Sequence, residues 1–592
     1  MAANQSQRIQ QISDAFQNED PPFEVHPDED VFRFQGKIGI RAHNQSACHQ
    51  AGRTKKAYYV EGSPHEMGYL LGRMAEPEVE RMCTEFNDRV IFEFVNVKFR
   101  NRKLEAALGN CLEVLLYWLS ANIYPDIPDD YKQELEGILD GCRAANPHTK
   151  VNWADLWVLN VGVDALLSYV YTGGLPVKKA LPLKIAPRHL AIPLKCNGFA
   201  VFGPAVQDNG HFLGRDFMFP TAGVFEDTAC LIVQNPEGDK KQPFVNMTAP
   251  GMIGCIAGMN VRGLGVGVDM SPAGNCDPSR PGFNSMLLAR YSIEHGQNCD
   301  QAVQIMEDAQ RGVSWLYILA DGTHQKACVV EAGCSTSTLD PLSCPPDRLK
   351  ESLPDEDFLR AHPSAEFRDG LMVRWSDYQY PDAYLGFNEA LFAKERKAYD
   401  PADFAEKGYI ATSWKDKSCP QGYYFAPQRE KNPHLVLVTN MCLIPEMRLF
   451  AMHPWTNLIS ASYYDDVQWR YDELNHRLLT RLSELSASGE KLTLEDAKEI
   501  IDFLDPCDDF PDYYNPPPER PFWRRWLDRL RGGLPGSRNS EPQRGDCQDV
   551  PILGSVSVMD LQSKRMHSRY GYYGDGWVQI TLPQYVTRLD AD

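Results

Sequence analysis

A cysteine and an arginine occupy the two ends of a short predicted β-hairpin. The segment begins at Cys196, turns at Asp-Asn-Gly in positions 208–210 and ends at Arg215. Apolar residues on both sides of such a turn signal are typical of two tightly joined strands. Because strands of about equal length return Arg215 to the neighbourhood of Cys196, the cation would favour the thiolate form of the cysteine. The thiolate is the nucleophilic form, so the segment predicts a nucleophile strand.

Other chemistries have little support in the sequence. The sixteen cysteines are scattered without a Cys-x-x-Cys pair, and no paired histidine motif accompanies them. Neither a zinc site nor a redox motif is therefore indicated. The chain also lacks the glycine-rich phosphate loop, the dinucleotide fingerprint, the Gly-x-Ser-x-Gly elbow and the His-Glu-x-x-His motif. We expect no metal ion and no cofactor.

Composition and charge narrow the class of protein further. The 592 residues include 43% hydrophobic and 24% charged side chains, which is typical of a folded globular chain. The formal net charge of −20 disfavours nucleic acid and anionic membranes as partners, since both select basic surfaces. The N-terminus has no apolar signal region, and no run of eighteen apolar residues occurs. These features predict a soluble cytoplasmic protein without a membrane partner.

Three kinds of sequence precede Cys196. Residues 1–56 are polar and predict a loosely packed N-terminal arm. Residues 57–195 begin with a strand and a turn, continue with a glycine-containing helix and are mainly helical up to about residue 170. The region ends in a linker, 175–195, with five basic residues, four prolines and no acidic residue. A basic run is usually a solvated face, but its position here predicts a tether across the site at Cys196.

Residues 196–592 predict a sheet region with two interruptions. Short strands over 226–270, followed by helices and strands over 285–333, fit helices packed on a sheet. The irregular stretches 334–433 and 507–550 break this pattern and are predicted insertions. Between them an apolar strand ends in Asn440, where a side-chain amide is well placed to donate to an oxyanion.

Several motifs in this order resemble those of the cysteine N-terminal-nucleophile (Ntn) hydrolases. They are Cys-x-Gly-Phe at 196–199, Gly-Arg-Asp at 214–216, Gly-Met-Asn-x-x-Gly-Leu at 258–264, Thr-Asn at 439–440 and an arginine-bearing helix start at 469–470. The resemblance is to the acyl-CoA:penicillin acyltransferase-like group in particular, with acid ceramidase and the bile-salt hydrolases as more distant relatives. It extends from about residue 57 to residue 585.

The resemblance implies an α+β fold, the four-layer αββα sandwich of Ntn hydrolases, elaborated by the two insertions. It also implies a precursor that cuts itself between Lys195 and Cys196. The fragments 1–195 and 196–592 would then remain associated. The substrate would be a small molecule with an amide or thioester bond, and the reaction hydrolysis or acyl transfer. Whether copies of the chain form a homo-oligomer stays open.

The resemblance also assigns roles to individual residues. The free α-amine of Cys196 would serve as the base for its own thiol. Arg215 would lower the thiol pKa and orient the substrate, and Asn440 would stabilise the oxyanion. Asn260 would lie by the substrate carbonyl, although it could instead only shape a hairpin turn. Arg470 would be either a second substrate-side cation or a surface charge.

Some positions depart from the family pattern. Many relatives carry a carboxylate three residues after the arginine, where this chain has Met218. Asp216, which follows Arg215 directly, is therefore a weaker candidate catalytic residue. Met441 stands where a histidine often follows the Thr-Asn motif, and Lys195 replaces a small residue before the cut.

These departures keep two other classes of protein open. The first is a catalytically degenerate Ntn-fold binding protein in which Cys196 stays uncut. The second is an unrelated thiol hydrolase that uses a Cys–His pair, with Cys196 and His434 as the candidates.

Overall fold

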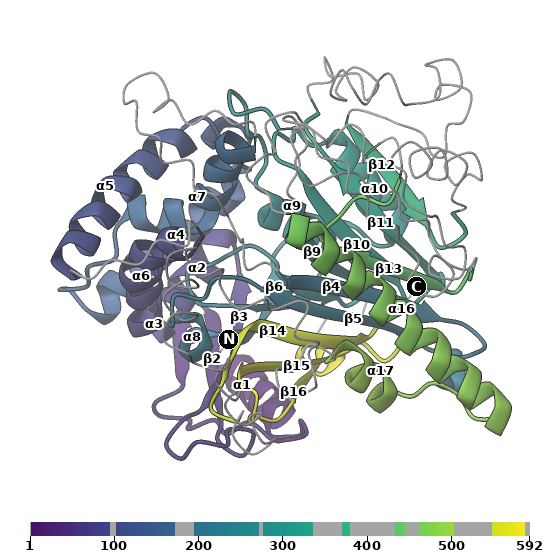
Figure 1. The fold of residues 1–592 in the computed structure, drawn as a ribbon. Coiled ribbons are helices and arrows are strands. Elements are labelled where there is room, and N and C mark those ends of the chain that lie inside the picture. Colours follow the sequence, from purple (N-terminus) through teal and green to yellow (C-terminus); the bar gives the residue numbers. More distant parts are fainter. Residues whose placement is uncertain are drawn as a thin grey trace, which may run out of the picture.

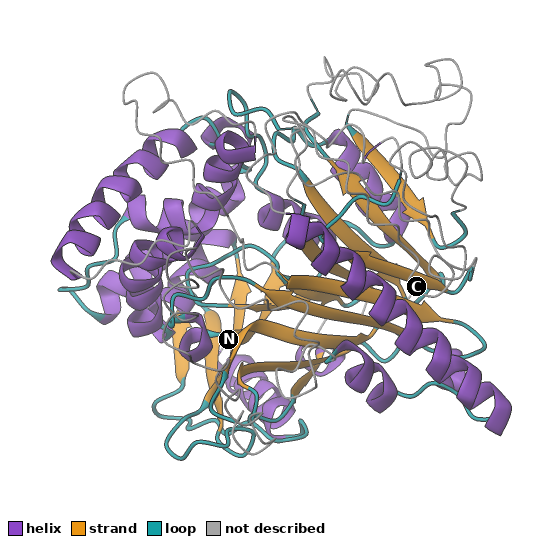
Figure 2. Ribbon diagram, viewed as in Figure 1, coloured by secondary structure: helices purple, strands orange, loops and turns teal. Residues whose placement is uncertain are grey.

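The computed structural model describes residues 2–94, 102–171, 195–271, 276–335, 370–378, 432–444, 447, 461–502 and 548–586. Two β-sheets lie at the centre of this part of the chain, with helices around them (Figure 1, Figure 2). The linker before Lys195 lies outside the described residues, as does most of the two predicted insertions, 334–433 and 507–550.

The larger sheet has ten strands among the described residues. In spatial order they are β1 (Val31–Phe34), β2 (Lys37–Asn44), β3 (Lys55–Gly62), β6 (Cys230–Pro236), β7 (Phe244–Thr248), β8 (Ala257–Asn260), β9 (Leu264–Met270), β10 (Trp315–Asp321), β11 (Lys326–Ala332) and β12 (Leu371–Trp375). Neighbouring strands run antiparallel except β3 and β6, which pair in parallel. That pair joins the N-terminal segment to the rest of the sheet, and the chain between its two strands includes several helices and also two strands of the smaller sheet, β4 (Lys195–Phe202) and β5 (His211–Met218).

The smaller sheet has six strands within the described ranges and is antiparallel throughout. Its order is β13 (Leu435–Thr439), β4 (Lys195–Phe202), β5 (His211–Met218), β14 (Pro551–Asp560), β15 (Arg565–Tyr572) and β16 (Val578–Thr581). The predicted hairpin is confirmed, since β4 and β5 pair with Gly198 opposite Arg215. Its turn places Asp208 and Asn209 at φ values of 54° and 55°, a left-handed conformation that these two residue types tolerate.

The two sheets pack face to face through alternating small residues of β9. Gly265 and Gly267 face the smaller sheet, and a Cβ added at Gly267 would lie 2.6 Å from Cδ of Arg215. A Cβ added at Gly198 of β4 would in turn lie 3.5 Å from Cγ2 of Ile318 in β10. Because strand side chains alternate between faces, β9 can bring its glycines to the sheet interface and its valines to the opposite side.

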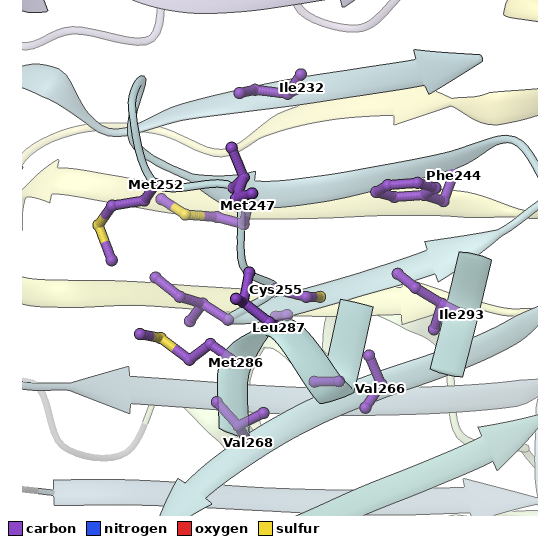
Figure 3. Close-up of a cluster of buried hydrophobic side chains, with 14 of the residues drawn as sticks. Ile232, Phe244, Met247, Met252, Cys255, Val266, Val268, Met286, Leu287 and Ile293 are labelled. Carbon is purple, nitrogen blue, oxygen red and sulfur yellow. The ribbon is translucent and has the colours of Figure 1, made fainter. Parts of the chain in front are cut away.

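The valines of β9 belong to a buried core between the larger sheet and a helix (Figure 3). Val266 and Val268 lie there with α9 (Ser285–His295), whose Met286, Leu287 and Ile293 point to the sheet. Fully burying each such side chain contributes about 1.5–3 kcal/mol, which fixes the strand in the sheet. The core thereby holds the residues on the other face of β9 in place.

Helices lie against the outer side of each sheet. On the larger sheet these include α2 (Pro64–Met74), α9 and α10 (Cys299–Asp308), and on the smaller sheet α16 (Ala461–Ser488) and α17 (Leu494–Ile501). The further helices are α1 (Ala2–Gln17), α3 (Glu76–Arg81), α4 (Asn87–Phe94), α5 (Arg102–Ser120), α6 (Asp129–Ala145), α7 (Trp153–Tyr171), α8 (Phe225–Thr228) and the short turns η1 (Met82–Phe86), η2 (Tyr124–Asp126), η4 (Gln207–Asn209) and η7 (Leu582–Tyr585). In the described part of the chain, no helix combines the length and apolarity that a bilayer crossing requires.

The predicted glycine-containing helix is α2, and its glycines permit a backbone contact with α6. A Cβ added at Gly68 would lie 2.0 Å from the carbonyl oxygen of Glu134, and one at Gly72 would lie 2.2 Å from that of Ile138. Side chains at these positions would separate the helices, so the glycines are required for the packing.

The N-terminal segment is not the loosely packed arm that its polarity predicts. It forms α1, β1 and β2, and Ile12, Phe16 and Phe23 are completely buried. Glu19 at the end of this helix region accepts hydrogen bonds from Thr581 and Tyr585 near the other end of the chain. A few well-spaced apolar residues were enough to dock a mostly polar segment.

Candidate active site

Cys196 lies at the start of β4 and is completely buried. Its thiol is 3.6 Å from the carbonyl oxygen of Met218, which pairs with the preceding residue, Lys195. Its backbone N–H donates to Oδ1 of Asn440 at 2.8 Å. Both the thiol and the backbone nitrogen of Cys196 are therefore held at defined positions.

Asn440 follows β13 directly and lies beside Cys196 because β13 and β4 are antiparallel, with Thr439 opposite Asn197. Its side-chain Nδ2 donates to the carbonyl oxygen of Met270 at 2.8 Å, and its Oδ1 also accepts from Arg470. The predicted strand that ends in Asn440 is thus confirmed, and the amide is anchored at both of its polar atoms.

Arg470 reaches the same place from α16. Its guanidinium donates to the carbonyl oxygen of Cys196 at 2.8 Å, to Oδ1 of Asn197 at 2.6 Å and to Oδ1 of Asn440 at 3.1 Å. The side chain is 0% exposed. The alternative that Arg470 is only a surface charge is therefore wrong.

Arg215 lies on the face of β5 that carries the thiol, because it pairs with Gly198, two residues along from Cys196. Its guanidinium donates to the carbonyl oxygens of Asn197 and Asp216. Within the described residues, its Nε and Nη2 have no hydrogen-bond partner although both are buried. Gly267 leaves the space that this side chain occupies.

Asp269 completes the cluster on the side of the larger sheet, although none of the sequence motifs includes it. Its Oδ1 lies 3.5 Å from Nη1 of Arg215, and both side chains are fully buried. Burial raises the pKa of Asp269 to about 6, against the opposing effect of Arg215 and Arg470. A sequence signal for Asp269 does exist. Gly265, Gly267 and Asp269 alternate with two valines, so the carboxylate is expected on the same strand face as the two glycines.

Asp216 lies on the opposite face of β5 from Arg215. Its Oδ2 accepts from Nδ2 of Asn197 at 2.9 Å, and burial raises its pKa to about 7 while Arg215 opposes that rise. Asn197 in turn contacts Arg470. Asp216 is therefore linked to the cluster through Asn197 and does not face the thiol.

The electrostatic effect of Arg215 on the thiol is only partly as expected. Arg215 does lower the pKa of Cys196, and a hydrogen bond from Asn440 acts in the same direction. Burial has the larger effect, however, and the net pKa of Cys196 is raised, with Asp269 and Asp216 contributing to the rise. In the continuous chain the thiol is thus held in its neutral form.

The structure does not bring Asn260 to this cluster. Its Nδ2 donates to the carbonyl oxygens of Ile293 and Gly296, both at 2.8 Å, and its Oδ1 accepts from the backbone of Arg262 and Leu264. These contacts use both hydrogens of the amide nitrogen and fasten the β8–β9 turn to the end of α9. The turn lies at the opposite end of β9 from Met270.

His434 is also far from Cys196. Its backbone oxygen accepts from Phe202, and its ring contacts the ring of that residue. The distance along β4 from residue 196 to residue 202 is about 20 Å, given about 3.3 Å per residue. A Cys196–His434 pair is therefore contradicted. Nor do the described ranges hold three His, Cys, Asp or Glu side chains placed to bind a metal ion.

A family model matches the part of the chain that holds two of the five motifs, 214–216 and 258–264. The family model "Acyl-coenzyme A:6-aminopenicillanic acid acyl-transferase" matches residues 207–340, which confirms the resemblance of this segment to that family. The match includes Arg215, Asp216, Asn260 and Asp269, whereas Cys196 lies outside it. An uncharacterized protein of Archaeoglobus fulgidus is 26% identical over 538 residues, covering 90% of this chain. The chain spans 66% of the length of that relative.

Solved structures with some similarity include a conjugated bile acid hydrolase and an acid amidase ortholog. Two variants of the conjugated bile acid hydrolase from Clostridium perfringens are 10% and 13% identical, cover 67% of this chain and 94% and 95% of their own, and have a TM-score of 0.28. The N-acylethanolamine-hydrolyzing acid amidase ortholog of Caenorhabditis elegans is 11% identical, with 23% of this chain and 59% of its own covered and a TM-score of 0.19.

Proposed function

We propose that the protein is a self-processing cysteine Ntn enzyme. It cuts its own chain between Lys195 and Cys196, and then hydrolyses or transfers the acyl group of a small-molecule amide or thioester. One observation carries this proposal: the backbone N–H of Cys196 donates to Asn440 while its carbonyl oxygen accepts from Arg470. Both partners are side chains and not neighbouring strands, and one of them holds the backbone nitrogen that cleavage would turn into an amine.

Self-cleavage would begin at the carbonyl carbon of Lys195. The sulfur of Cys196 adds to this carbon, the peptide C–N bond breaks, and the nitrogen of Cys196 takes up a proton as a free amine. Water then hydrolyses the thioester and releases the carboxyl group of Lys195. The buried pair of Arg215 and Asp269 beside the thiol supplies fixed charge for these steps.

In the cleaved enzyme the α-amine of Cys196 would keep Oδ1 of Asn440 as its acceptor. An α-amine has a pKa of about 8, so it can take the thiol proton near neutral pH. The thiolate attacks the acyl carbon of the substrate, and the side-chain amide of Asn440, which lies beside the thiol, would donate to the oxyanion. Losing one such donor typically costs about 2.7–4 kcal/mol of transition-state stabilisation. Water or an amine releases the acyl group.

The proposed fold is the four-layer αββα sandwich. Its support is the order of layers, with α9 and α10 on the larger sheet, the two sheets in contact through β9 and β5, and α16 and α17 on the smaller sheet. The proposed units are a fragment 1–195 and a fragment 196–592.

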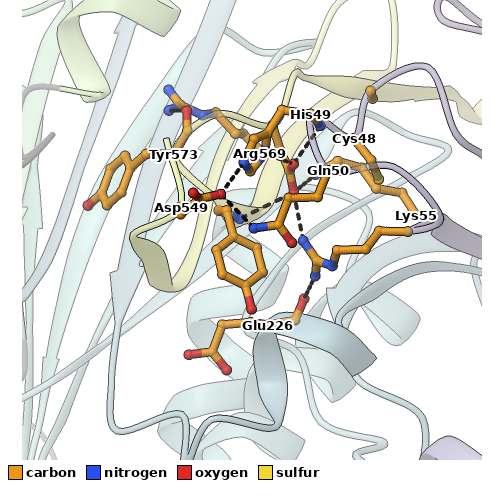
Figure 4. A network of polar contacts seen from close by, with 12 residues as sticks. Cys48, His49, Gln50, Lys55, Glu226, Asp549, Arg569 and Tyr573 are labelled. Atoms are coloured by element: carbon orange, nitrogen blue, oxygen red, sulfur yellow. Dashed lines mark hydrogen bonds and ion pairs between the residues drawn. The ribbon is translucent and has the colours of Figure 1, made fainter. Parts of the chain in front are cut away.

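The two fragments have extensive contacts that a cut would leave in place. β3 belongs to fragment 1–195 and β6 to fragment 196–592, and the two strands pair in the larger sheet. A polar network also joins residues 48–55 to the C-terminal strands (Figure 4). In this network His49 contacts Asp549 and Asp575, each at 2.9 Å, and Lys55 donates to the backbone of Tyr570. The fragments would therefore separate only when the protein unfolds.

Intact-mass analysis of the purified full-length protein tests the proposal. Two fragments are expected, and N-terminal sequencing of the larger one should begin Cys-Asn-Gly-Phe. A single species of 66.9 kDa that hydrolyses no amide or thioester would instead support a degenerate binding protein of the same fold. A new N-terminus elsewhere would contradict the assignment of Cys196.

A further inference from the structure

A buried ion pair of the larger sheet contacts the segment that carries Asn440. Glu331 of β11 and Arg374 of β12 are on the same face of the sheet, with Nε of Arg374 3.4 Å from Oε1 of Glu331. The side chains are 0% and 1% exposed. Burying two charges is costly unless both are paired and hydrogen-bonded, so such a pair is weak evidence for stability and needs another explanation.

The hydrogen bonds of this pair run to the other sheet. Nη2 of Arg374 donates to the carbonyl oxygen of Leu437 in β13 at 2.6 Å. The carboxylate of Glu331 accepts from the backbone N–H of Leu443 at 2.8 Å and from that of Ile444 at 3.2 Å and 3.3 Å. The contacts lie three residues before Asn440 and three and four residues after it.

The segment between these contacts needs such anchors. β13 is an edge strand among the described residues, with β4 as its neighbour in the sheet. After β13 the chain turns at once, since the N–H of Met441 donates to the carbonyl oxygen of Thr439 at 2.7 Å. Without Glu331, the N–H groups of Leu443 and Ile444 would be buried without this acceptor.

We infer that Glu331 and Arg374 are positioning residues for Asn440. They hold the chain on both sides of it, so that its side chain meets the backbone N–H of Cys196. The inference rests on the proposed function for its catalytic meaning, but its geometric content is independent of any reaction. A carboxylate is required at position 331 because three donors converge on it, whereas a glutamine offers one acceptor oxygen and directs its NH₂ group at another donor.

The first test uses the uncut full-length chain carrying Cys196→Ala, in which the backbone N–H at position 196 is retained. Amide hydrogen exchange, measured by mass spectrometry on overlapping peptides, is compared with and without Glu331→Gln. Exchange at 196, 443 and 444 should accelerate about tenfold or more, since a charged acceptor is lost. Unchanged exchange at 196 would overturn the inference even if exchange at 443 and 444 increased.

The matched control is Glu134→Gln. Glu134 is a similarly buried carboxylate paired with an arginine, Arg290 at 2.6 Å, and its described side-chain hydrogen bonds are to Arg290 and Gln234, not to Cys196 or Asn440. It should lower the melting temperature in a similar way but leave exchange at 196, 443 and 444 unchanged. Equal acceleration by both variants would show a general loss of stability and would overturn the positioning role.

A second test measures the rate of self-cleavage in a double-mutant cycle. Glu331→Gln should slow cleavage by about 10- to 100-fold, the effect expected of a displacement of about 1 Å in a catalytic group. In an Asn440→Ala background the same change should have almost no further effect, because the side chain that Glu331 positions is absent. Equal effects in both backgrounds would overturn the inference. Absence of cleavage in the wild-type chain would overturn the proposed function instead, and the exchange test would still decide the positioning.

Discussion

Gly267 leaves the space in which the side chain of Arg215 lies, because a Cβ at this glycine would come within 2.6 Å of the arginine Cδ and 2.9 Å of its Nε. The glycine is on the larger sheet and the arginine on the smaller one. The position of the guanidinium beside Cys196 therefore depends on how closely the two sheets approach.

This relationship predicts the effect of Gly267→Ala. Overpacking a core position typically costs about 1–3 kcal/mol of stability, and here the displaced group is a cation of the proposed site. We expect slower self-cleavage together with a lower melting temperature. The matched control is Gly265→Ala on the same face of β9, whose added Cβ would meet the apolar tips of Leu213 and Leu561. It should lower the melting temperature similarly and leave cleavage near the wild-type rate. Similar cleavage rates in the two variants would count against a role for the position of Arg215.

Substitution of Cys196 separates a nucleophile from a structural cysteine. Cys196→Ala should give a folded, uncut and inactive chain, since no side-chain atom remains to accept the acyl group of Lys195. Cys196→Ser should cut slowly or partially, because a hydroxyl ionises less readily than a thiol. Mass spectrometry of both variants, with thermal melting as a control for folding, measures the outcome. Wild-type activity in Cys196→Ala would end the Ntn assignment.

Asn260 is predicted to act on stability and not on the reaction. Asn260→Ala removes the two hydrogen bonds to the end of α9 and leaves two backbone N–H groups without an acceptor. Buried polar groups left in this way cost about 1–3 kcal/mol each, so the melting temperature should fall. The self-cleavage rate and, once a substrate is known, KM should stay near wild-type values under folding conditions. A large rise in KM in a stable variant would restore the substrate role that the family resemblance implied.

The network in Figure 4 predicts a pH-dependent contact between the two proposed fragments. Hydrogen bonds to Asp549 and Asp575 raise the pKa of His49. The contribution of protonated His49 to the free energy of unfolding is therefore complete below the unfolded pKa of about 6.5. It is lost as the pH rises through the higher pKa of the folded state. Both aspartates have a lowered pKa, so they remain charged down to the acid end of this range.

The measurement is the difference in melting temperature between wild type and His49→Gln as a function of pH. The difference should be largest between about pH 4 and pH 6.5 and should shrink as the pH rises further. His65→Gln is the comparison variant, because His65 forms its ion pair with the exposed Asp140 and such surface pairs contribute little. A His49 difference that stays constant from pH 5 to pH 9 would refute the prediction.

The sequence predicted those parts of the site that depend on local pattern. The hairpin from Cys196 to Arg215 followed from its turn signal, and Asn440 followed from the end of an apolar strand. The predicted helix start at 469–470 is wrong, since Arg470 lies inside α16 (Ala461–Ser488). Its burial could not be predicted, because a helical pattern does not show which sheet the helix will cover. The true surroundings of Asn260 were hidden for the same reason, since its partners come from the end of α9, more than thirty residues away.

Charges inside the molecule were the other source of error. Asp269 lies five residues beyond the Gly-Met-Asn-x-x-Gly-Leu motif, and its importance appears only when β9 packs against Arg215. The opposite error affected the thiol, where sequence proximity to an arginine predicted a thiolate and burial proved the larger effect. The N-terminal segment was misjudged because its polar composition concealed Ile12 and Phe16, which are completely buried.

The contact between Arg470 and the carbonyl oxygen of Cys196 spans 274 residues of sequence. On a ribosome that adds about 5–20 residues per second, Arg470 is synthesised about 14–55 s after Cys196. A scissile bond that depends on this contact stays intact while the nascent chain is short. In the proposed self-processing reaction, maturation would thereby wait until residue 470 has been synthesised, and a truncated translation product that ends before Arg470 would remain a single piece.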